Sequence, residues 1–196
     1  MAPRTLTSIQ PTGVGNLVGG VSPAPMDAGA LRAACAQFAT GVVVVTASAD
    51  GQDFGGTVNS FTSLSLEPPQ VIVCLARTSN TWSAIERSQT FAVNVLAADQ
   101  LGTAQLFASK EVGKLSQVDS EPGVVGAPLL TGALSHLECT VADVIASGTH
   151  LLVIGRVVRV AHDAAKDPAL FFRSQMFDGF SAAAPSADGL PIRRDQ

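Results

Sequence analysis

The most unusual property of this sequence is how few charged residues it contains. Asp, Glu, Lys and Arg make up 14% of its 196 residues, against about 25% in an ordinary soluble domain. Hydrophobic residues stand at 46%, which is an ordinary value, so Ala, Gly, Ser and Thr replace the missing charges. A chain with so little charged surface is expected to bury part of that surface in an oligomer or around a ligand.

The few charges present argue against binding to nucleic acid or to a membrane surface. The formal net charge is −4, and Arg193–Arg194 is the only adjacent basic pair. A nucleic-acid binder needs a basic stripe to neutralise phosphates, and a membrane-surface binder needs a basic cluster. The sequence has neither the long apolar run of a membrane span nor the apolar core of a secretory signal. We therefore expect a soluble, cytoplasmic protein with no nucleic-acid or membrane partner.

Cysteine and histidine are too sparse to predict a disulfide framework or a metal site. Cys35, Cys74 and Cys139 are far apart, each within an apolar stretch, and form no CxxC. This odd, scattered set is typical of reduced thiols that serve as small core residues. The three histidines form no HxH or HExxH pattern, so no metal site is predicted.

Two other common enzyme signatures are also absent. No GxSxG occurs, so nothing favours a serine hydrolase. The Gly-rich segment 13–20 follows no predicted strand and opens no clear helix, as a dinucleotide-binding turn would.

Pro and Gly divide the chain into one domain and two tails. Residues 1–26 are rich in both and lack any hydrophobic period, which indicates a flexible arm. Residues 181–196 have the composition of a second flexible tail. The compact domain is therefore predicted over residues 27–180.

Few helices are predicted within this domain. The first spans residues 27–39, with Asp27 as its cap and Leu31, Cys35 and Phe38 at helical spacing on one face. Others are expected near 79–88 and 98–109, and Asp167–Pro168 is predicted to begin a short helical turn.

Short apolar runs separated by turn residues account for most of the remaining domain. Asp50–Gly51 is typical of a two-residue hairpin turn. Because strands dominate and no βαβ alternation occurs, we predict a mostly β, antiparallel barrel or sandwich with a few short capping helices. The predicted strands include 42–45, 71–76, 91–97, 135–145 and 150–162.

One segment, residues 55–65, is dense in small polar side chains. It contains two glycines, which permit close backbone approach, followed by hydroxyl and amide groups. This composition suits a ligand with many hydrogen-bond acceptors, such as a flavin ring or a phosphate. An ordinary Ser/Thr-rich turn between strands has the same composition, and the residues alone leave both interpretations open.

The ordered motifs of the whole domain resemble the flavin reductase-like family, small NAD(P)H:flavin oxidoreductases that supply reduced flavin to two-component monooxygenases. The similarity covers residues 28–178. The matching stretches, in family order, are 38–47, 57–69, 71–81, 91–100, 107–110, 126–139 and 147–157.

This resemblance implies a fold and a set of flavin-binding residues. The fold is an FMN-binding split β-barrel, a Greek-key antiparallel barrel, which forms a homodimer with FMN or FAD near the subunit interface. Lys110 is expected to donate to a phosphate. The implied flavin contacts are Thr57, Val58, Asn59 and Ser60 along the ring, Ser63, Ser65, Ser79, Asn80 and Thr81 near the ribityl and phosphate groups, and Phe107, Ala108, Ser109 and Lys110 in a second turn.

The nicotinamide site departs from the family pattern. The usual Gly-Asp-His is here Gly148-Thr149-His150, so a neutral hydroxyl stands where the family has a carboxylate. The resemblance implies that His150 contacts the nicotinamide or positions it beside the flavin. The chain also contains no Tyr, and Phe177 occupies the segment where the family often has one. Phe177 is therefore the candidate to stack on the flavin or nicotinamide ring.

The implied activity is hydride transfer from NADH or NADPH to FMN or FAD, with reduced flavin passed to an oxygenase partner. The two departures leave an alternative open: a flavin-binding carrier or accessory protein without reductase activity. A flavin-bound oxidase acting on a small organic substrate is a further alternative.

Overall fold

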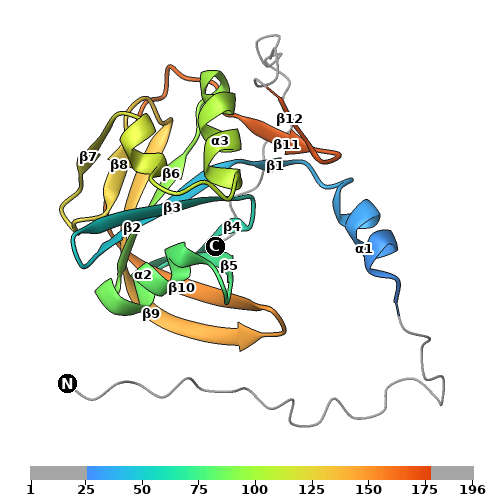
Figure 1. Cartoon of the computed structure of the whole chain (residues 1–196), viewed down its shortest axis with the longest axis horizontal. Helices are drawn as coiled ribbons and strands as arrows, with labels where there is room; N and C mark the ends of the chain where they lie inside the picture. Colours follow the sequence, from blue (N-terminus) through green and yellow to red (C-terminus); the bar gives the residue numbers. More distant parts are fainter. Residues whose placement is uncertain (1–25, 178–196) are drawn as a thin grey trace.

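A computed structural model describes residues 26–177 of the chain, so the predicted arm and tail lie outside the described residues apart from Met26. The prediction of a mostly β, antiparallel fold is confirmed, because the main body is one sheet of seven antiparallel strands (Figure 1). From edge to edge, these strands are β3 (Gln52–Val58), β2 (Val43–Ala49), β6 (Thr90–Val95), β9 (Ser135–Ser147), β10 (His150–His162), β5 (Pro69–Ala76) and β4 (Phe61–Leu66).

The sheet is strongly curled. Its two edge strands, β3 and β4, are consecutive in sequence and are joined only by Asn59–Ser60. Two residues of fully extended chain span only about 7 Å. The end of β3 and the start of β4 therefore lie close together, and the opposite edges of the sheet approach each other there. Among the described strands, no backbone hydrogen bonds pair β3 with β4, so the curled sheet does not close into a complete barrel between these two strands.

The inside of the curl holds the main hydrophobic core. Alternate residues of β2, β5 and β10 point inward, among them Val45, Val73 and Val153, all fully buried. Helix α2 (Asn80–Ser88) closes one end of this core with Trp82 and Ile85. The predicted hairpin turn at Asp50–Gly51 is confirmed, since both residues adopt the positive φ angles that such turns require.

Two further apolar clusters lie on the outside of the sheet. Helix α3 (Leu101–Ala108), preceded by the 3₁₀ turn η1 (Ala98–Gln100), packs Ala104 and Phe107 against Val42 and Val44. The pair β7 (Ser120–Pro122) and β8 (Pro128–Leu130) follows the 3₁₀ turn η2 (Lys114–Gln117). Ala127 and Leu129 from this segment pack on Ala92 of β6. The outer faces of β2 and β6 are therefore covered by the chain itself.

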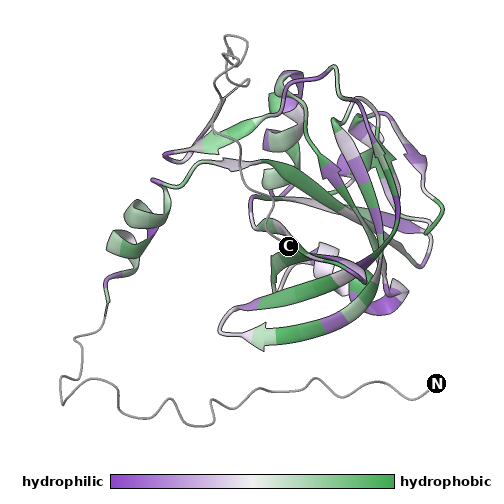
Figure 2. Cartoon of the chain, turned by 180° about the vertical axis from the view of Figure 1, so that it is seen from behind, coloured by the Kyte–Doolittle hydropathy of each residue, from purple (hydrophilic) through white to green (hydrophobic). Residues whose placement is uncertain are grey.

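The N-terminal helix is shorter and more exposed than predicted. Helix α1 (Ala28–Cys35) buries none of its residues, and Leu31 and Phe38 remain 56% and 74% exposed. Cys35 is exposed and Cys74 half-buried, so only Cys139 fits the prediction of a fully buried core thiol. α1 stands clear of the large sheet in both views (Figures 1 and 2).

The predicted helical turn at Asp167–Pro168 is wrong. The segment runs extended beside residues 96–98: Ala98 N donates to Asp167 O at 2.8 Å, and Ala169 N donates to Leu96 O at 3.0 Å. These pairings consume the backbone groups that a helix would use. The chain then forms β11 (Leu170–Phe172), which pairs with β1 (Thr40–Gly41), and β12 (Gln175–Phe177), which pairs with β11, so the three strands make a small sheet. Within residues 26–177, no helix is long and apolar enough to cross a bilayer.

Candidate flavin site

A cavity of about 1080 Å³ lies between β3, the start of α2 and the end of α3. It is the larger of the two cavities described here. Its lining residues are Gln52, Asp53, Phe54, Gly55, Gly56, Ala76, Thr78, Ser79, Asn80, Thr81, Phe107, Ala108, Ser109, Lys110, Glu111, Val112, Gly113, Lys114, Leu115, Ser116 and Ser120. Seven of the predicted flavin contacts, residues 79–81 and 107–110, therefore meet on one surface although they are distant in sequence.

The floor of the cavity depends on two glycines of β3. A Cβ atom on Gly55 would lie 2.6 Å from Cε1 of Phe107, closer than real Cβ contacts allow. A Cβ on Gly56 would lie 3.3 Å from Oγ1 of Thr81. The glycines let α3 and α2 approach the strand from two sides, and the backbone of β3 forms the floor between them.

The first turn of α2 forms a second wall. The hydroxyl of Ser79 caps the helix by accepting a hydrogen bond from Trp82 N at 3.1 Å. Asn80 and Thr81 lie in the first turn, where backbone amides have no acceptor within the helix. These amides and the positive end of the helix dipole favour an anionic group such as phosphate.

Lys114 organises the third wall. Its Nζ donates to the carbonyl oxygens of Phe107 at 2.9 Å and Ser109 at 2.7 Å, which satisfies acceptors left open at the end of α3. Burial lowers the pKa of Lys114, and the charge of Glu111 partly opposes this shift. The sequence did not predict Lys114 as a site residue, because it lies several residues beyond the predicted helix end at residue 109 and only the return of the chain brings it to the end of α3.

The cavity wall carries charge of both signs. Lys110 and Lys114 contribute two ammonium groups, and Asp53 and Glu111 contribute two carboxylates. The Asp53 carboxylate accepts a hydrogen bond from the Ser48 hydroxyl, which holds it toward β2. Within residues 26–177, no group of three or more His, Cys, Asp or Glu side chains could hold a metal ion.

The predicted ring contacts at residues 57–60 lie beyond this wall, at the β3–β4 connection. The Thr57 hydroxyl donates to Ala104 O at 2.7 Å. The Ser60 hydroxyl donates to Cys74 O at 3.0 Å and accepts from Cys74 N at 3.1 Å. Val58 packs against the inner core, and Asn59 is exposed. Both hydroxyls are thus used to hold neighbouring elements in place.

The structure separates Ser63 and Ser65 from the other residues predicted near the ribityl and phosphate groups. Ser63 and Ser65 pair with Val71 and Gln70, at the beginning of β5. Ser79, by contrast, follows the end of β5, and a strand of eight residues is about 26 Å long. The two serines of β4 and the start of α2 therefore lie toward opposite ends of one strand.

The predicted nicotinamide residues form the tip of the β9–β10 hairpin. Gly148 adopts the positive φ of +54° that the turn requires. Oγ1 of Thr149 lies 2.9 Å from Nδ1 of His150, and Arg77 N donates to Thr149 O at 3.1 Å. His150 is directly opposite Ala76, a lining residue of the cavity. The hairpin tip therefore lies beside the cavity rim.

Phe177 belongs to a different sheet from the predicted nicotinamide residues Gly148, Thr149 and His150. Its backbone pairs with Leu170 in the small sheet that contains β1. The placement of its side chain lies outside what the structure describes.

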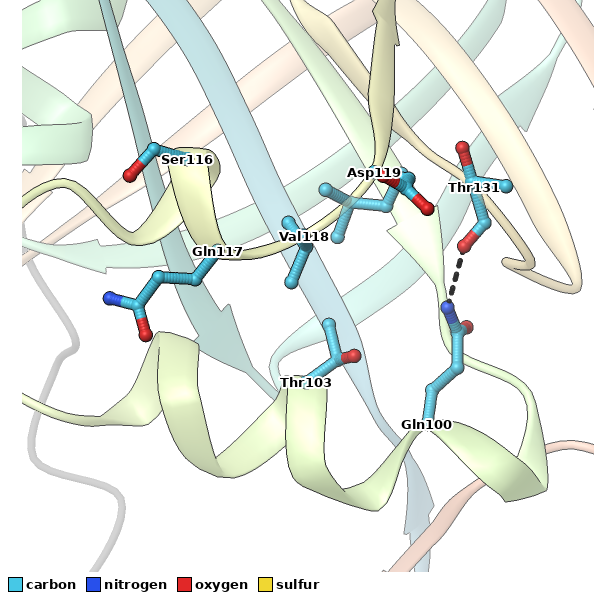
Figure 3. Close-up of a pocket in the computed structure, with 8 residues that line it drawn as sticks. Gln100, Thr103, Ser116, Gln117, Val118, Asp119 and Thr131 are labelled. Atoms are coloured by element: carbon cyan, nitrogen blue, oxygen red, sulfur yellow. Dashed lines mark hydrogen bonds between the residues drawn. The ribbon is translucent and has the colours of Figure 1, made fainter.

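A second pocket of about 420 Å³ lies on the other side of η2, between α3 and β8 (Figure 3). Its lining is mostly polar and includes Thr103, Gln117 and Asp119. The Gln100 side chain donates to Thr131 O at 3.0 Å across its edge. Ser116 lines both cavities, so η2 is their shared wall, but no residue predicted for flavin or nicotinamide binding lines the smaller pocket.

Comparison with known proteins shows the family to which the chain belongs. The model of the flavin reductase like domain family matches residues 35–179. The chain is 40% identical over 157 residues to the reductase subunit HsaB of a flavin-dependent monooxygenase from Rhodococcus jostii, covering 80% of each protein. It is also 40% identical to a flavin reductase from Pseudomonas putida, covering 77% of this chain and 89% of that protein.

A solved structure shows the same fold. The NADH:FAD oxidoreductase SgcE6 of Streptomyces globisporus, in complex with NAD and FAD fragments, superposes with a TM-score of 0.74 at 37% identity. The match covers 81% of this chain and 93% of that one. With the family model spanning nearly the whole described region, the resemblance found in the sequence is confirmed: this chain belongs to the flavin reductase like domain family.

Proposed function

We propose that the protein is an NAD(P)H-dependent flavin reductase that transfers a hydride from NADH or NADPH to FMN or FAD. The observation that supports this most strongly is the large cavity, which unites the β3 glycines, the first turn of α2 and the end of α3. The start of α2 and the end of α3 each belong to a stretch that resembles the family, and the relatives named above are reductases of this kind.

The residues present fit a flavin nucleotide. The glycines of β3 let the Phe107 ring and the Thr81 side chain approach the strand closely, and a Cβ at Gly55 would displace Phe107, which lines the cavity. The first turn of α2 and the ammonium group of Lys110 suit a phosphate, while Lys114 holds the end of α3 in place through its bonds to Phe107 O and Ser109 O. When bound, flavin and nicotinamide supply the redox chemistry themselves, and the protein supplies binding, orientation and exclusion of water.

His150 and Thr149 are the residues proposed to position the nicotinamide. The hairpin tip is held to the end of β5 by the bond from Arg77 N to Thr149 O, so the backbone of His150 lies beside the cavity rim. The Thr149 hydroxyl orients the ring through Nδ1, which leaves Nε2 free to meet a ligand. No acid–base residue is required for hydride transfer between the two cofactors, and the cavity wall presents no acid–base pair in contact.

The finer assembly also belongs to this proposal. The curled sheet is the open form of the FMN-binding split barrel, and the low charge content supports a homodimer. Reduced flavin is proposed to pass transiently to an oxygenase partner, because the relatives include reductase subunits of flavin-dependent monooxygenases. Cytoplasmic location stays a prediction from the sequence.

The test is steady-state oxidation of NADH and NADPH with FMN, FAD or riboflavin as acceptor, with flavin binding measured separately by fluorescence quenching. Turnover with at least one pair supports the proposal, and the relative kcat/KM values identify the preferred donor and acceptor. Tight flavin binding without turnover for any pair would overturn it.

That negative outcome would favour the second candidate, a flavin-binding carrier or accessory protein. One observation favours this second candidate: Thr149 places a neutral hydroxyl where the family usually has a carboxylate. A carrier would use the same cavity and would not depend on His150.

A further inference from the structure

The large cavity extends well past the place where a flavin phosphate would be held. That place is the first turn of α2, and Thr81 of this turn meets β3 at Gly56. The cavity lining continues along β3 from Gly56 back to Gln52, which is about 13 Å of extended strand. The opposite wall, residues 111–116, belongs to the segment that leads into η2 and follows this strand. A ligand that ended at the phosphate would leave this part of the cavity empty.

The flavin ring does not account for that space. The predicted ring contacts, residues 57–60, follow Gly56 in the direction away from Gln52, and none of them lines the cavity. A mononucleotide with its ring there and its phosphate at α2 therefore points away from the Gln52 end. The cavity volume of about 1080 Å³ matches the largest ordinary small-molecule sites. The cavity is thus too long and too large for the phosphate end of a mononucleotide alone.

An aromatic side chain stands in the unfilled part. Phe54 lines the cavity, is partly exposed, and packs at its back against the inner core. The Arg87 guanidinium lies over the ring at 6.0 Å from its centroid, and Asp50 pairs with Arg87 at 2.9 Å. A ring held in this way offers a flat apolar surface, and nucleic-acid bases stack on such rings. Phe54 therefore suits a purine base.

Two carboxylates face the same space from opposite walls. Asp53 comes from β3 and Glu111 from the segment after α3, and both are exposed. The Ser48 hydroxyl donates to one oxygen of Asp53, which leaves the other oxygen as an acceptor. Carboxylates accept hydrogen bonds from ribose hydroxyls in dinucleotide sites. Their negative charge also disfavours a further phosphate on that ribose. The chemistry of this part is therefore that of an adenosine with free ribose hydroxyls.

We propose that this part of the cavity binds the adenosine half of FAD, so that the protein prefers FAD over FMN. The inference rests on the proposed reductase function and names its flavin. In FAD the adenosine is joined through its own phosphate to the flavin phosphate at α2, which places it next to Phe54 and Asp53. NADH contains the same adenosine, but Thr149 and His150, the residues assigned to its nicotinamide, do not line the cavity.

The first experiment is isothermal titration of the full-length protein with FAD, FMN and riboflavin in the absence of nicotinamide nucleotide. We expect FAD to bind about tenfold or more tightly than FMN, which is the effect of one additional base stack. Equal dissociation constants for FAD and FMN would overturn the inference. Steady-state NADH oxidation with FMN would then still support the reductase, so the two failures are distinguishable.

A matched pair of variants tests the place of the adenosine. Phe54→Leu and Phe61→Leu each remove a partly buried ring that packs against the inner core, but only Phe54 lines the cavity. The readout is the ratio of the FMN to the FAD dissociation constant, because a general loss of packing weakens both flavins alike and leaves this ratio unchanged. We expect Phe54→Leu to lower the ratio about fivefold and Phe61→Leu to change it less than about twofold.

The remaining outcomes contradict the inference. Equal changes of the ratio in the two variants would show that Phe54 acts only through packing. A ratio unchanged by Phe54→Leu, together with a raised KM for NADH, would show that this part of the cavity serves the adenosine of NADH instead of that of FAD.

Discussion

The hydroxyl of Thr149 lies 2.9 Å from Nδ1 of His150 at the tip of the β9–β10 hairpin. The family pattern usually has a carboxylate at the position of Thr149, so the group that contacts the imidazole here is neutral. The orientation of the imidazole is therefore set by a single hydrogen bond without an ion pair.

Removing that hydroxyl should weaken the use of nicotinamide and spare flavin binding. Thr149→Val keeps the side-chain shape and loses the contact with Nδ1. We expect kcat/KM for the nicotinamide donor to fall about fivefold, the equivalent of the ~1 kcal/mol that one hydrogen bond contributes. Flavin dissociation constants measured by fluorescence should stay the same. An unchanged kcat/KM would show that Thr149 does not orient His150.

His150→Ala should separate turnover from flavin affinity. The imidazole borders the cavity rim beside Ala76 and is absent from the residues that line the cavity. We expect turnover to fall by about tenfold or more, because hydride transfer depends on donor geometry, while the flavin dissociation constant changes less than about twofold. Kinetics like those of the wild type would remove His150 from the mechanism.

Gly55→Ala should disturb the cavity floor. The added Cβ would meet the ring of Phe107 at 2.6 Å, and this ring is buried in the outer cluster. We expect a loss of about 1–3 kcal/mol of stability from overpacking, together with weaker flavin binding. Gly102→Ala is the matched control on α3, where a Cβ meets nothing within 4 Å. That control should raise the free energy of unfolding by about 0.5–1 kcal/mol, measured by urea denaturation.

Lys110 and Lys114 should affect different properties. Lys110→Met removes an exposed charge, so we expect weaker binding of FMN and FAD, which contain phosphate, and unchanged binding of riboflavin, which does not. Lys114→Met also breaks the bonds to Phe107 O and Ser109 O, so all three flavins should bind less tightly and the melting temperature should fall. Titration of each variant with the three flavins checks this. If Lys114→Met weakened FMN and FAD binding but left riboflavin binding unchanged, Lys114 and not Lys110 would be the phosphate-binding residue.

Cys139 should be unreactive in the folded protein. Burial, with a smaller contribution from the neighbouring Glu138 charge, raises the pKa of the Cys139 thiol to about 12. Its folded pKa lies above the ordinary value of 9.0, so the contribution of this thiol to stability is complete below pH 9.0 and declines between pH 9.0 and about 12. Maleimide labelling followed by peptide mass analysis should modify Cys139 only after denaturation, at pH 7 and at pH 9 alike. Labelling of native Cys139 that accelerates with pH would contradict this.

Local sequence determined the class of elements and their order. Asp50–Gly51, the Ser79 cap and the alternation along β9 are decided by neighbouring residues, so the hairpin, α2 and the long strand were all predictable. The ordered motifs likewise predicted the family. The exposed face of α1 was not predictable, because helical spacing shows that a helix has an apolar side and does not show what covers it.

Contacts between residues far apart in the sequence decided which side chains share the candidate site. The cavity joins β3, α2, α3 and η2, and Lys114 belongs to it only because the chain returns to the end of α3. Ser63 and Ser65 look adjacent to the other polar residues in sequence, yet register places them at the far end of β5. Backbone dihedral preferences and hydrophobic period act over a few residues, and they set the elements. Burial and register act between residues far apart in the chain, and they alone determine which polar groups share one surface.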